Sequence, residues 1–283
     1  MMVSNYKEIE TTCPICGLSK SLNVPEVIFA QKKFGTIKIQ VPIGAVCPEH
    51  QFIVFVDSKG TIRGYEKIDI QMAMPSAETE LEKAGVLTLR RLIQLFGLYG
   101  IFSLIHSKVF NYPAYIIIDD DFKYSEDILN NIGEMLVPER YKGEKLVNLL
   151  EETDYGNIII KEKYALLMDT HQHILQTPWE EKLKFEESML KKALEIIDEE
   201  EQLVLIQQTI AKLIKEAEYS KGILENVKEI YEDDLMEQLS RDLMIPKISH
   251  YRLNLIKSFI RQRFSPKLAS RIKNKVEEFL DLL

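Results

Sequence analysis

Residues 12–17 read TCPICG, and residues 47–50 read CPEH. Each stretch places two metal-binding side chains two residues apart: Cys13 with Cys16, and Cys47 with His50. Three thiolates and one imidazole make a closed tetrahedral set for zinc, with no position left for a substrate. The sequence therefore predicts one structural zinc ion, held by these four residues.

The cysteine count supports the same interpretation. The 283-residue chain has three cysteines, an odd number, which excludes a closed set of disulfides and leaves no cysteine over for catalysis. The alternative is that these are buried cysteines and a surface histidine, but the paired spacing favours the metal. Reduced thiols are typical of the cytoplasm. No apolar signal region precedes Cys13, and the apolar stretch Leu92–Ile105 is too short to span a membrane. We therefore expect a cytoplasmic protein without a transmembrane segment.

Residues 11–50, extending as far as residue 70, resemble a zinc ribbon. In such a module two knuckles are joined by a β-hairpin, which is expected here at Val24–Ile43. The run CPEHQFIVFVDSKGTIRGY is also similar to N-terminal modules of uncharacterised archaeal proteins. The resemblance implies a metal-stabilised β module and brings no activity with it. The rest of the chain resembles no family that we can name, although its middle part is similar in outline to longin-like or roadblock-like adaptor domains.

The predicted fold class is α+β, in three parts. A zinc-ribbon-like β module covers residues 1–74, a mixed α/β domain covers 75–178, and a helical region covers 179–283. Alternating apolar residues predict strands at Val24–Phe29, Ile37–Ile43, Phe52–Val56, Thr61–Ile70, Ala114–Ile118, Asn157–Lys161, Tyr164–Met168 and His173–Gln176. Helices are predicted from Glu78 to about Phe110 with a break near Gly97 or Gly100, from Ser125 to Leu136, at Glu144–Glu151, and throughout the chain after Trp179.

The C-terminal region carries a heptad pattern. Apolar residues from Leu203 to Tyr231 follow 3-4 spacing, which predicts a coiled-coil seam and a homo-oligomer formed through residues 203–231. Pro246 is expected to end this helical stretch, and Ser249 and Ser265 are expected to cap the helices that follow. One stripe, Leu268, Ile272, Val276 and Phe279, predicts a last helix.

Two short stretches share one design. FIVFVDSKGTI (52–62) and YALLMDTHQHI (164–174) are each an apolar strand, an Asp, a turn and an Ile, which predicts two hairpins with Asp57 and Asp169 closing the turns. The second stretch also resembles the Asp-Thr-His-x-His strand end of metal-dependent amidohydrolases and related nucleases. That resemblance implies metal binding by His171 and His173, but the further ligands of such enzymes are missing downstream. A polar hairpin turn is the favoured interpretation.

Two other polar features have plain interpretations beside functional ones. Asp119, Asp120 and Asp121 follow a short apolar strand and could hold Mg²⁺, yet no phosphate-binding loop accompanies them, and a solvated turn before a helix is favoured. His106 lies in an apolar helical stretch and is expected to be a core residue rather than a catalytic base.

Charge separates along the C-terminal region. The net charge of the chain is −8, yet residues 179–240 carry 8 basic and 17 acidic residues, and residues 241–283 carry 10 basic and 4 acidic ones. The basic end could contact nucleic acid or an acidic partner, or it could pack against the acidic helices that precede it. The candidate contact residues are Lys257, Arg261, Arg263, Lys267, Arg271, Lys273 and Lys275.

These observations predict a non-enzymatic adaptor or complex subunit that acts through protein–protein contacts. A nucleic-acid-associated factor that uses the zinc ribbon and the basic helices is the alternative. A metal-dependent hydrolase is the third interpretation and requires a second metal ion. The sequence leaves the enzyme question open, although the closed metal set favours a role without catalysis.

Overall fold

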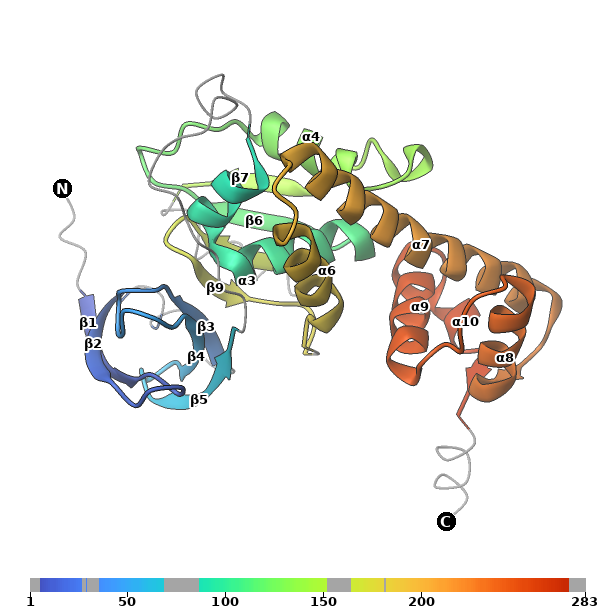
Figure 1. Cartoon of the computed structure of the whole chain (residues 1–283), viewed down its shortest axis with the longest axis horizontal. Coiled ribbons are helices and arrows are strands. Elements are labelled where there is room, and N and C mark those ends of the chain that lie inside the picture. Colours follow the sequence, from blue (N-terminus) through green and yellow to red (C-terminus); the bar gives the residue numbers. More distant parts are fainter. Residues whose placement is uncertain are drawn as a thin grey trace, which may run out of the picture.

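The fold was obtained as a computed structural model, which describes residues 6–26, 29, 36–68, 87–151, 164–180 and 182–274. It is an α+β fold, as predicted, with strands at the N-terminus and helices toward the C-terminus (Figure 1). The strands are β1 (Tyr6–Thr12), β2 (Ser19–Pro25), β3 (Thr36–Val41), β4 (Phe52–Asp57), β5 (Ile62–Lys67), β6 (Ala114–Ile117), β7 (Val147–Leu150), β8 (Leu166–Asp169), β9 (His173–Gln176), β10 (Ile230–Tyr231) and β11 (Ile272–Lys273). The helices are α3 (Leu89–Phe110), α4 (Glu126–Met135), the 3₁₀ turn η1 (Glu139–Tyr141), α6 (Lys184–Leu194), α7 (Glu199–Asn226), α8 (Glu232–Asp242), α9 (His250–Arg263) and α10 (Pro266–Ala269).

A seven-stranded sheet joins the N-terminal and middle parts. Its strand order is β5-β4-β3-β9-β8-β6-β7, in which β7, β6 and β8 are parallel and the other neighbours are antiparallel. The junction is short: β3 pairs with β9 only at Lys38↔Ile174 and Ile39↔His173. The first two predicted domains therefore share one sheet, while the boundary at residue 74 lies outside the described residues. The boundary at residue 178 remains a prediction.

The two faces of the central sheet belong to different cores. Ile116 and Met168 belong to the core that contains α3 and the C-terminal helices. Their neighbours Ile117 and Leu167 belong to the core of the N-terminal β module. Successive side chains of a strand point to opposite faces, so burial on both sides produces the continuous apolar runs seen in β6 and β8.

Helix α3 lies against this sheet and is kinked at Gly97, one of the two positions predicted for a break. Gly97 has φ 71° and ψ 166°, a conformation that essentially only glycine adopts. The kink frees the backbone N–H of Tyr99, which donates to Gln40 Oε1 on β3 at 2.8 Å. The helix begins at Leu89, capped by Thr88, and the predicted start at Glu78 lies outside the described residues.

By length and composition alone, α3 is also apolar enough to cross a membrane. Its most apolar 18-residue window has a mean hydropathy of 1.3 and is 78% buried inside the fold. Such burial is what a core helix of a folded domain shows. Near its C-terminal end His106 is 1% exposed, bonds Glu186 through Nδ1 at 2.8 Å and stacks on Phe110, which confirms His106 as a core residue.

The predicted helix at Glu144–Glu151 is wrong. Residues Val147–Leu150 form β7, which pairs in parallel with β6 from Ala114↔Val147 to Ile117↔Leu150. The side chain of Asn130 on α4 accepts from the backbone N–H of Val147 at 3.0 Å, which fixes the start of the strand. Pairing with β6 overrides the local helical pattern. The strand predicted at Asn157–Lys161 lies outside the described residues.

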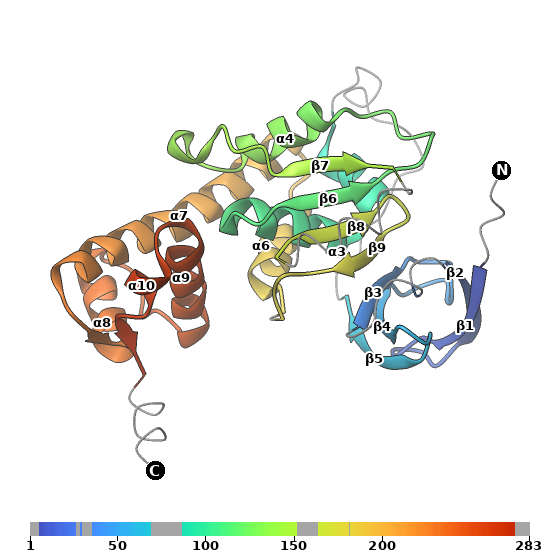
Figure 2. The same cartoon turned by 180° about the vertical axis from the view of Figure 1, so that it is seen from behind.

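The C-terminal helices gather around the far end of α7, which is 28 residues long and connects them to the central part (Figures 1 and 2). Gly222 lies within this helix, and Pro246 lies between α8 and α9. Ser249 and Ser265 cap α9 and α10 through their hydroxyls, as predicted. The predicted last helix is wrong at Ile272, which pairs with Ile230 as part of β11. The positions of Val276 and Phe279 lie outside the described residues.

The heptad seam is buried inside a single chain. Ile206, Ile210, Leu213, Ala217 and Leu224 are at most 2% exposed and belong to the core that also contains residues of α6 and α9. The seam is therefore occupied by the chain's own helices. The expected self-association through residues 203–231 stays a prediction, and it would have to use the side chains of this stretch that are exposed, such as Val204, Tyr219 and Tyr231.

Candidate metal centre

The first knuckle is the loop between β1 and β2. Cys13 follows β1, and the N–H of Gly17 donates to the carbonyl of Cys13 at 2.9 Å. Gly17 has φ 77°, a value that favours glycine, and this turn brings Cys13 and Cys16 to one side of the loop. The antiparallel pairing Thr12↔Ser19 closes the loop at its base.

The second knuckle is the connection between β3 and β4. The N–H of Gly44 donates to the carbonyl of Cys47 at 2.8 Å, and Gly44 has φ 89°. Cys47 and His50 therefore lie in a tight loop between Val41 and Phe52. Each knuckle is the loop of its own antiparallel pair, because β2 pairs with β1 and β3 pairs with β4. Among the described strands, the expected hairpin at Val24–Ile43 is therefore wrong.

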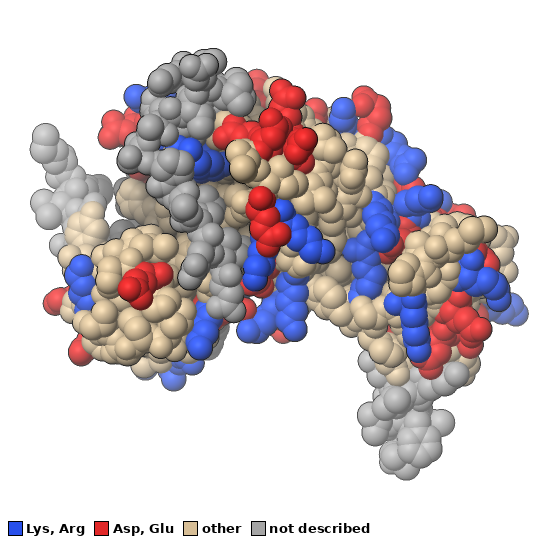
Figure 3. All heavy atoms as spheres, viewed as in Figure 1, with Lys and Arg blue, Asp and Glu red and all other residues tan. Residues whose placement is uncertain are grey.

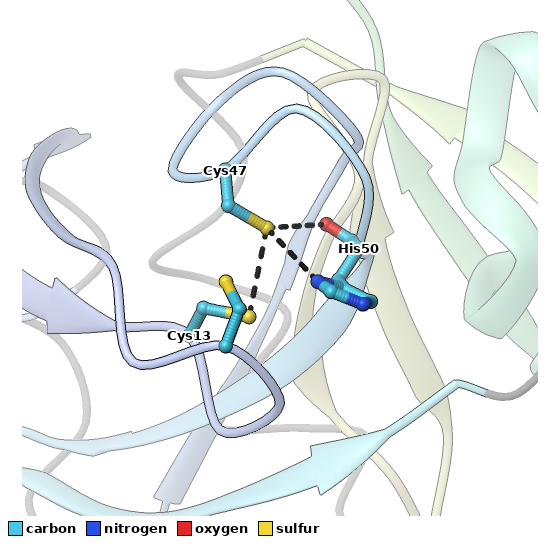
Figure 4. A group of neighbouring side chains, drawn as sticks. Cys13, Cys47 and His50 are labelled. Carbon is cyan, nitrogen blue, oxygen red and sulfur yellow. Dashed lines mark hydrogen bonds between the residues drawn. The ribbon is translucent and has the colours of Figure 1, made fainter.

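The two knuckles meet as the spacing predicts. The Sγ atoms of Cys13 and Cys47 are 3.5 Å apart, and Cys47 Sγ is 3.5 Å from His50 Nδ1. The ligand atoms of Cys13, Cys16, Cys47 and His50 all lie within 4.8 Å of one another. Cys13, Cys47 and His50 point toward a common centre (Figure 4). A tetrahedral ion with metal–sulfur bonds of about 2.3 Å needs sulfur atoms roughly 3.7 Å apart, so the four residues fit one metal ion.

The thiols differ in their ease of ionisation. Burial opposes the ionisation of Cys13, but hydrogen bonds from the N–H groups of Cys16 and Ile15 and from the neighbouring thiols lower its pKa to about 7. The N–H of Leu18 favours the Cys16 thiolate, yet desolvation and the neighbouring thiols outweigh it, so the pKa of Cys16 is raised. The Cys13 thiolate therefore forms near neutral pH, whereas the proton of Cys16 must be displaced by the metal.

The two hairpins of shared design are closed as predicted. Asp57 Oδ1 accepts from the N–H groups of Lys59 and Thr61, each at 2.9 Å. Asp169 Oδ1 accepts from the N–H groups of His171 and His173, also at 2.9 Å. The second oxygen of each Asp binds a side chain further along its hairpin: Arg63 Nε donates to Asp57 at 2.8 Å, and His173 Nδ1 lies 2.7 Å from Asp169.

The remaining candidate ligands do not form a second metal group. His171 lies at the exposed ends of β6 and β8, where its Nδ1 is 3.6 Å from Asp119 Oδ2, and Thr170 bonds the same carboxylate. Asp120 and Asp121 are exposed. Within the described ranges, the Cys and His cluster is the one group with donor atoms close enough to hold a metal.

Most of the basic side chains bind the chain itself. Lys257 bonds Glu232 at 2.7 Å, and Lys273 lies 3.6 Å from Glu229, so both contact the acidic stretch that precedes them. The Nη1 atom of Arg271 donates to the carbonyls of Leu224 and Val227.

Arg263 is also bound internally and reaches the middle part of the chain. It bonds Glu144 and the carbonyls of Lys108 and Val109. Blue and red side chains lie next to one another over the C-terminal helices (Figure 3). Arg261 and Lys267 are exposed, and Lys275 lies outside the described residues.

One feature of the metal centre was missed by the sequence patterns. Ile15 and Leu18 in the first knuckle are 40% and 50% exposed, and Ile43 beside the second is 47% exposed. The sequence did contain a signal for this exposed apolar surface, namely apolar residues within or beside the short loops that carry the ligands. Such loops are too tight to bury every side chain.

Comparisons of the chain with models of known families, with curated proteins and with solved structures found no match. The class of molecule is therefore defined by the fold and the site: an α+β chain whose N-terminal β module carries a Cys₃His group for one metal ion.

Proposed function

We propose that the chain is a non-enzymatic adaptor or complex subunit whose N-terminal β module holds one structural zinc ion and binds a protein partner. The observation that carries the proposal is the metal centre. Its four protein ligands complete a tetrahedral set, and the loops that supply them expose Ile15, Leu18 and Ile43. Exposed apolar side chains on a rigid, metal-held loop suit a protein contact. The free thiols fit a reducing compartment such as the cytoplasm.

The nucleic-acid alternative has less support. Phosphate binding needs free cations, and Lys257, Arg263 and Arg271 are engaged with acids or carbonyls of the same chain. The alternative would rest mainly on Arg261 and Lys267, which are exposed. A hydrolase would need a second metal group, and the described residues contain a single such group, the cluster of Cys13, Cys16, Cys47 and His50.

The metal part is tested by metal analysis of the purified chain. Replacing Cys47 by Ser removes one of four ligands, so we expect the loss of about one zinc per chain and of folded structure in the N-terminal module. The matched control is His171→Ala, which lies outside the group and should keep its zinc. A chain that keeps its zinc in Cys47→Ser, or that loses a second metal in His171→Ala, would contradict the assignment.

The partner contact is tested in two stages. Affinity purification from the native host with crosslinking identifies the partner, and calorimetry on the purified pair measures its dissociation constant. Introducing Ile15→Asp and Leu18→Asp together should weaken binding by at least about tenfold, because it places charge in an apolar contact. Ile197→Asp is the control, since Ile197 is 97% exposed between α6 and α7.

Unchanged binding of the partner by the Ile15→Asp, Leu18→Asp double variant would show that the exposed apolar residues of the first knuckle do not form the contact. If nucleic acid copurifies with the chain, and if its binding is lost when Arg261 and Lys267 are replaced by Glu, the result would favour the nucleic-acid-associated function.

A further inference from the structure

A cavity of about 510 Å³ lies between α3, α4, the strands β6 and β7, and the first turns of α7. Its walls are mainly aliphatic and include Ile101, Ile105, Leu129, Leu136 and Leu203. Protein cores are otherwise packed with few voids larger than a water molecule. The volume falls within the range of roughly 300–1,000 Å³ that is typical of small-molecule sites, which are mostly apolar with a few polar groups.

Two polar residues at the end of α3 line this cavity. Ser107 is 2% exposed, and its hydroxyl has no hydrogen-bond partner among the described residues. Buried hydroxyl groups are nearly always bonded, so an unpartnered one that lines a cavity points to a missing acceptor or donor. Nothing in the packing of the aliphatic walls requires a hydroxyl at this position.

The neighbouring Lys108 is 6% exposed and also lines the cavity. Its ammonium donates to the carbonyl of Glu144 at 2.9 Å, which uses one of its three donors. Burial and the nearby Arg263 lower the pKa of Lys108, while Glu134 and Glu144 act in the opposite direction. The lowered pKa means that the cation is not fully compensated by the acids around it, so an anion here would stabilise it.

Acidic side chains also restrict where the head group of a ligand can bind in the cavity. Glu199 and Glu200, in the first turn of α7, also line it. A negative head group would be repelled there and attracted at the end of α3. A ligand that matches the aliphatic walls and the two donors at the end of α3 has a flexible apolar body and one acceptor-only anionic head.

We propose that this cavity binds a free fatty acid, with its carboxylate at Lys108 and Ser107 and its aliphatic chain along the walls of α3 and α4. The carboxylate would accept hydrogen bonds from the ammonium and from the unpartnered hydroxyl. This site is separate from the metal centre and does not rest on the proposed adaptor function.

The test uses calorimetry on the full chain with saturated monocarboxylic acids of about C8 to C14, kept below the concentration at which they aggregate. Each buried methylene should raise the affinity about fourfold until the chain outgrows the cavity. Replacing Lys108 by Met should weaken binding of the acids by about tenfold or more and leave binding of the matching primary alcohols unchanged. Lys142→Met is the control, because Lys142 lies outside the cavity and pairs with Glu139.

A second variant tests the location. Leu129→Trp should fill the cavity and abolish binding of the acids, and if this variant does not fold, Met135→Trp at the exposed rim serves instead. Absence of binding, an affinity that does not depend on chain length, or alcohols that bind as tightly as the acids would overturn the proposal. Acid binding that survives both tryptophan variants would also overturn it.

Discussion

At the scale of single residues, Asp57 and Asp169 close the turns of two hairpins in the same way. One oxygen of each carboxylate accepts two backbone N–H groups of its turn, and the other oxygen binds a basic side chain. A carboxylate that accepts several N–H bonds is stabilised in its charged form. The repeated eleven-residue pattern therefore reflects one local solution to turn closure, used in both parts of the sheet.

The charge of Asp57 has a measurable consequence for stability. The N–H of Thr61 and the guanidinium of Arg63 lower the pKa of Asp57 against the opposing effect of desolvation. A lowered folded-state pKa gives stability that is present above the unfolded value of about 3.9 and is lost as the pH falls through the folded value. Asp57→Asn should therefore be less stable than the natural chain at pH 7, and the difference should shrink below about pH 4.

Urea unfolding of the natural and variant chains side by side at several pH values measures this difference, because any loss of metal in acid then affects both chains alike. Asp120→Asn is the control, because Asp120 is an exposed acid of the turn after β6. A gap between Asp57→Asn and the natural chain that stays constant down to pH 3 would show that the charge of Asp57 plays no part.

At the scale of elements, the kink of α3 is built by two elements together. Gly97 leaves the helical conformation, and Gln40 from β3 accepts the N–H of Tyr99 that the kink releases. The same glutamine leaves no room for a side chain, since a Cβ atom on Gly97 would lie 2.6 Å from the atoms of its amide. The break is therefore fixed by the sheet as well as by the glycine.

Replacing Gly97 by Ala should lower the free energy of unfolding by about 2–4 kcal/mol, because strain at positive φ adds to the clash with Gln40. Gly222→Ala is the matched control. Gly222 lies inside α7 with nothing within 4 Å of an added Cβ. The free energy of unfolding of this variant should therefore rise by about 0.5–1 kcal/mol, because alanine favours the helix more than glycine does. Denaturant titration of both variants measures their free energies of unfolding. Equal effects of the two substitutions would contradict the proposed strain and clash at Gly97.

At the scale of the whole molecule, Arg263 connects the C-terminal helices to the middle part. Its side chain is 3% exposed, and it donates to the carbonyls of Lys108 and Val109 at the end of α3 while pairing with Glu144. Those carbonyls have no helical partner of their own, so the guanidinium completes the hydrogen bonding of the helix end. One residue thereby couples α9, α3 and the segment before β7.

Arg263→Met should cost about 2–4 kcal/mol of stability, because it leaves buried carbonyls and Glu144 without their partner. Arg261→Met, two residues earlier on the exposed side of α9, should change stability by less than about 0.5 kcal/mol. Thermal unfolding of the two variants makes the comparison. Equal melting temperatures would show that the contact does not hold the parts together.

Local patterns determined several features directly. The spacing of Cys13, Cys16, Cys47 and His50 predicted the metal group, Ser249 and Ser265 were predicted as helix caps, and Gly97 was one of two expected breaks. The helix caps and the break at Gly97 depend on residues close in sequence. The metal group depends on a ligand chemistry in which four side chains surround one ion. That is why the sequence by itself was sufficient for them.

Tertiary structure alone decided the rest. Residues Val147–Leu150 became a strand because β6 offered an edge for pairing, and the buried part of the heptad seam of α7 packs in one core with the chain's own helices. Four of the seven candidate basic residues found partners at acids and carbonyls of the same chain. Periodicity shows that a face will be buried and charge shows that it will seek a partner, but which surface meets it depends on contacts between residues far apart in the chain.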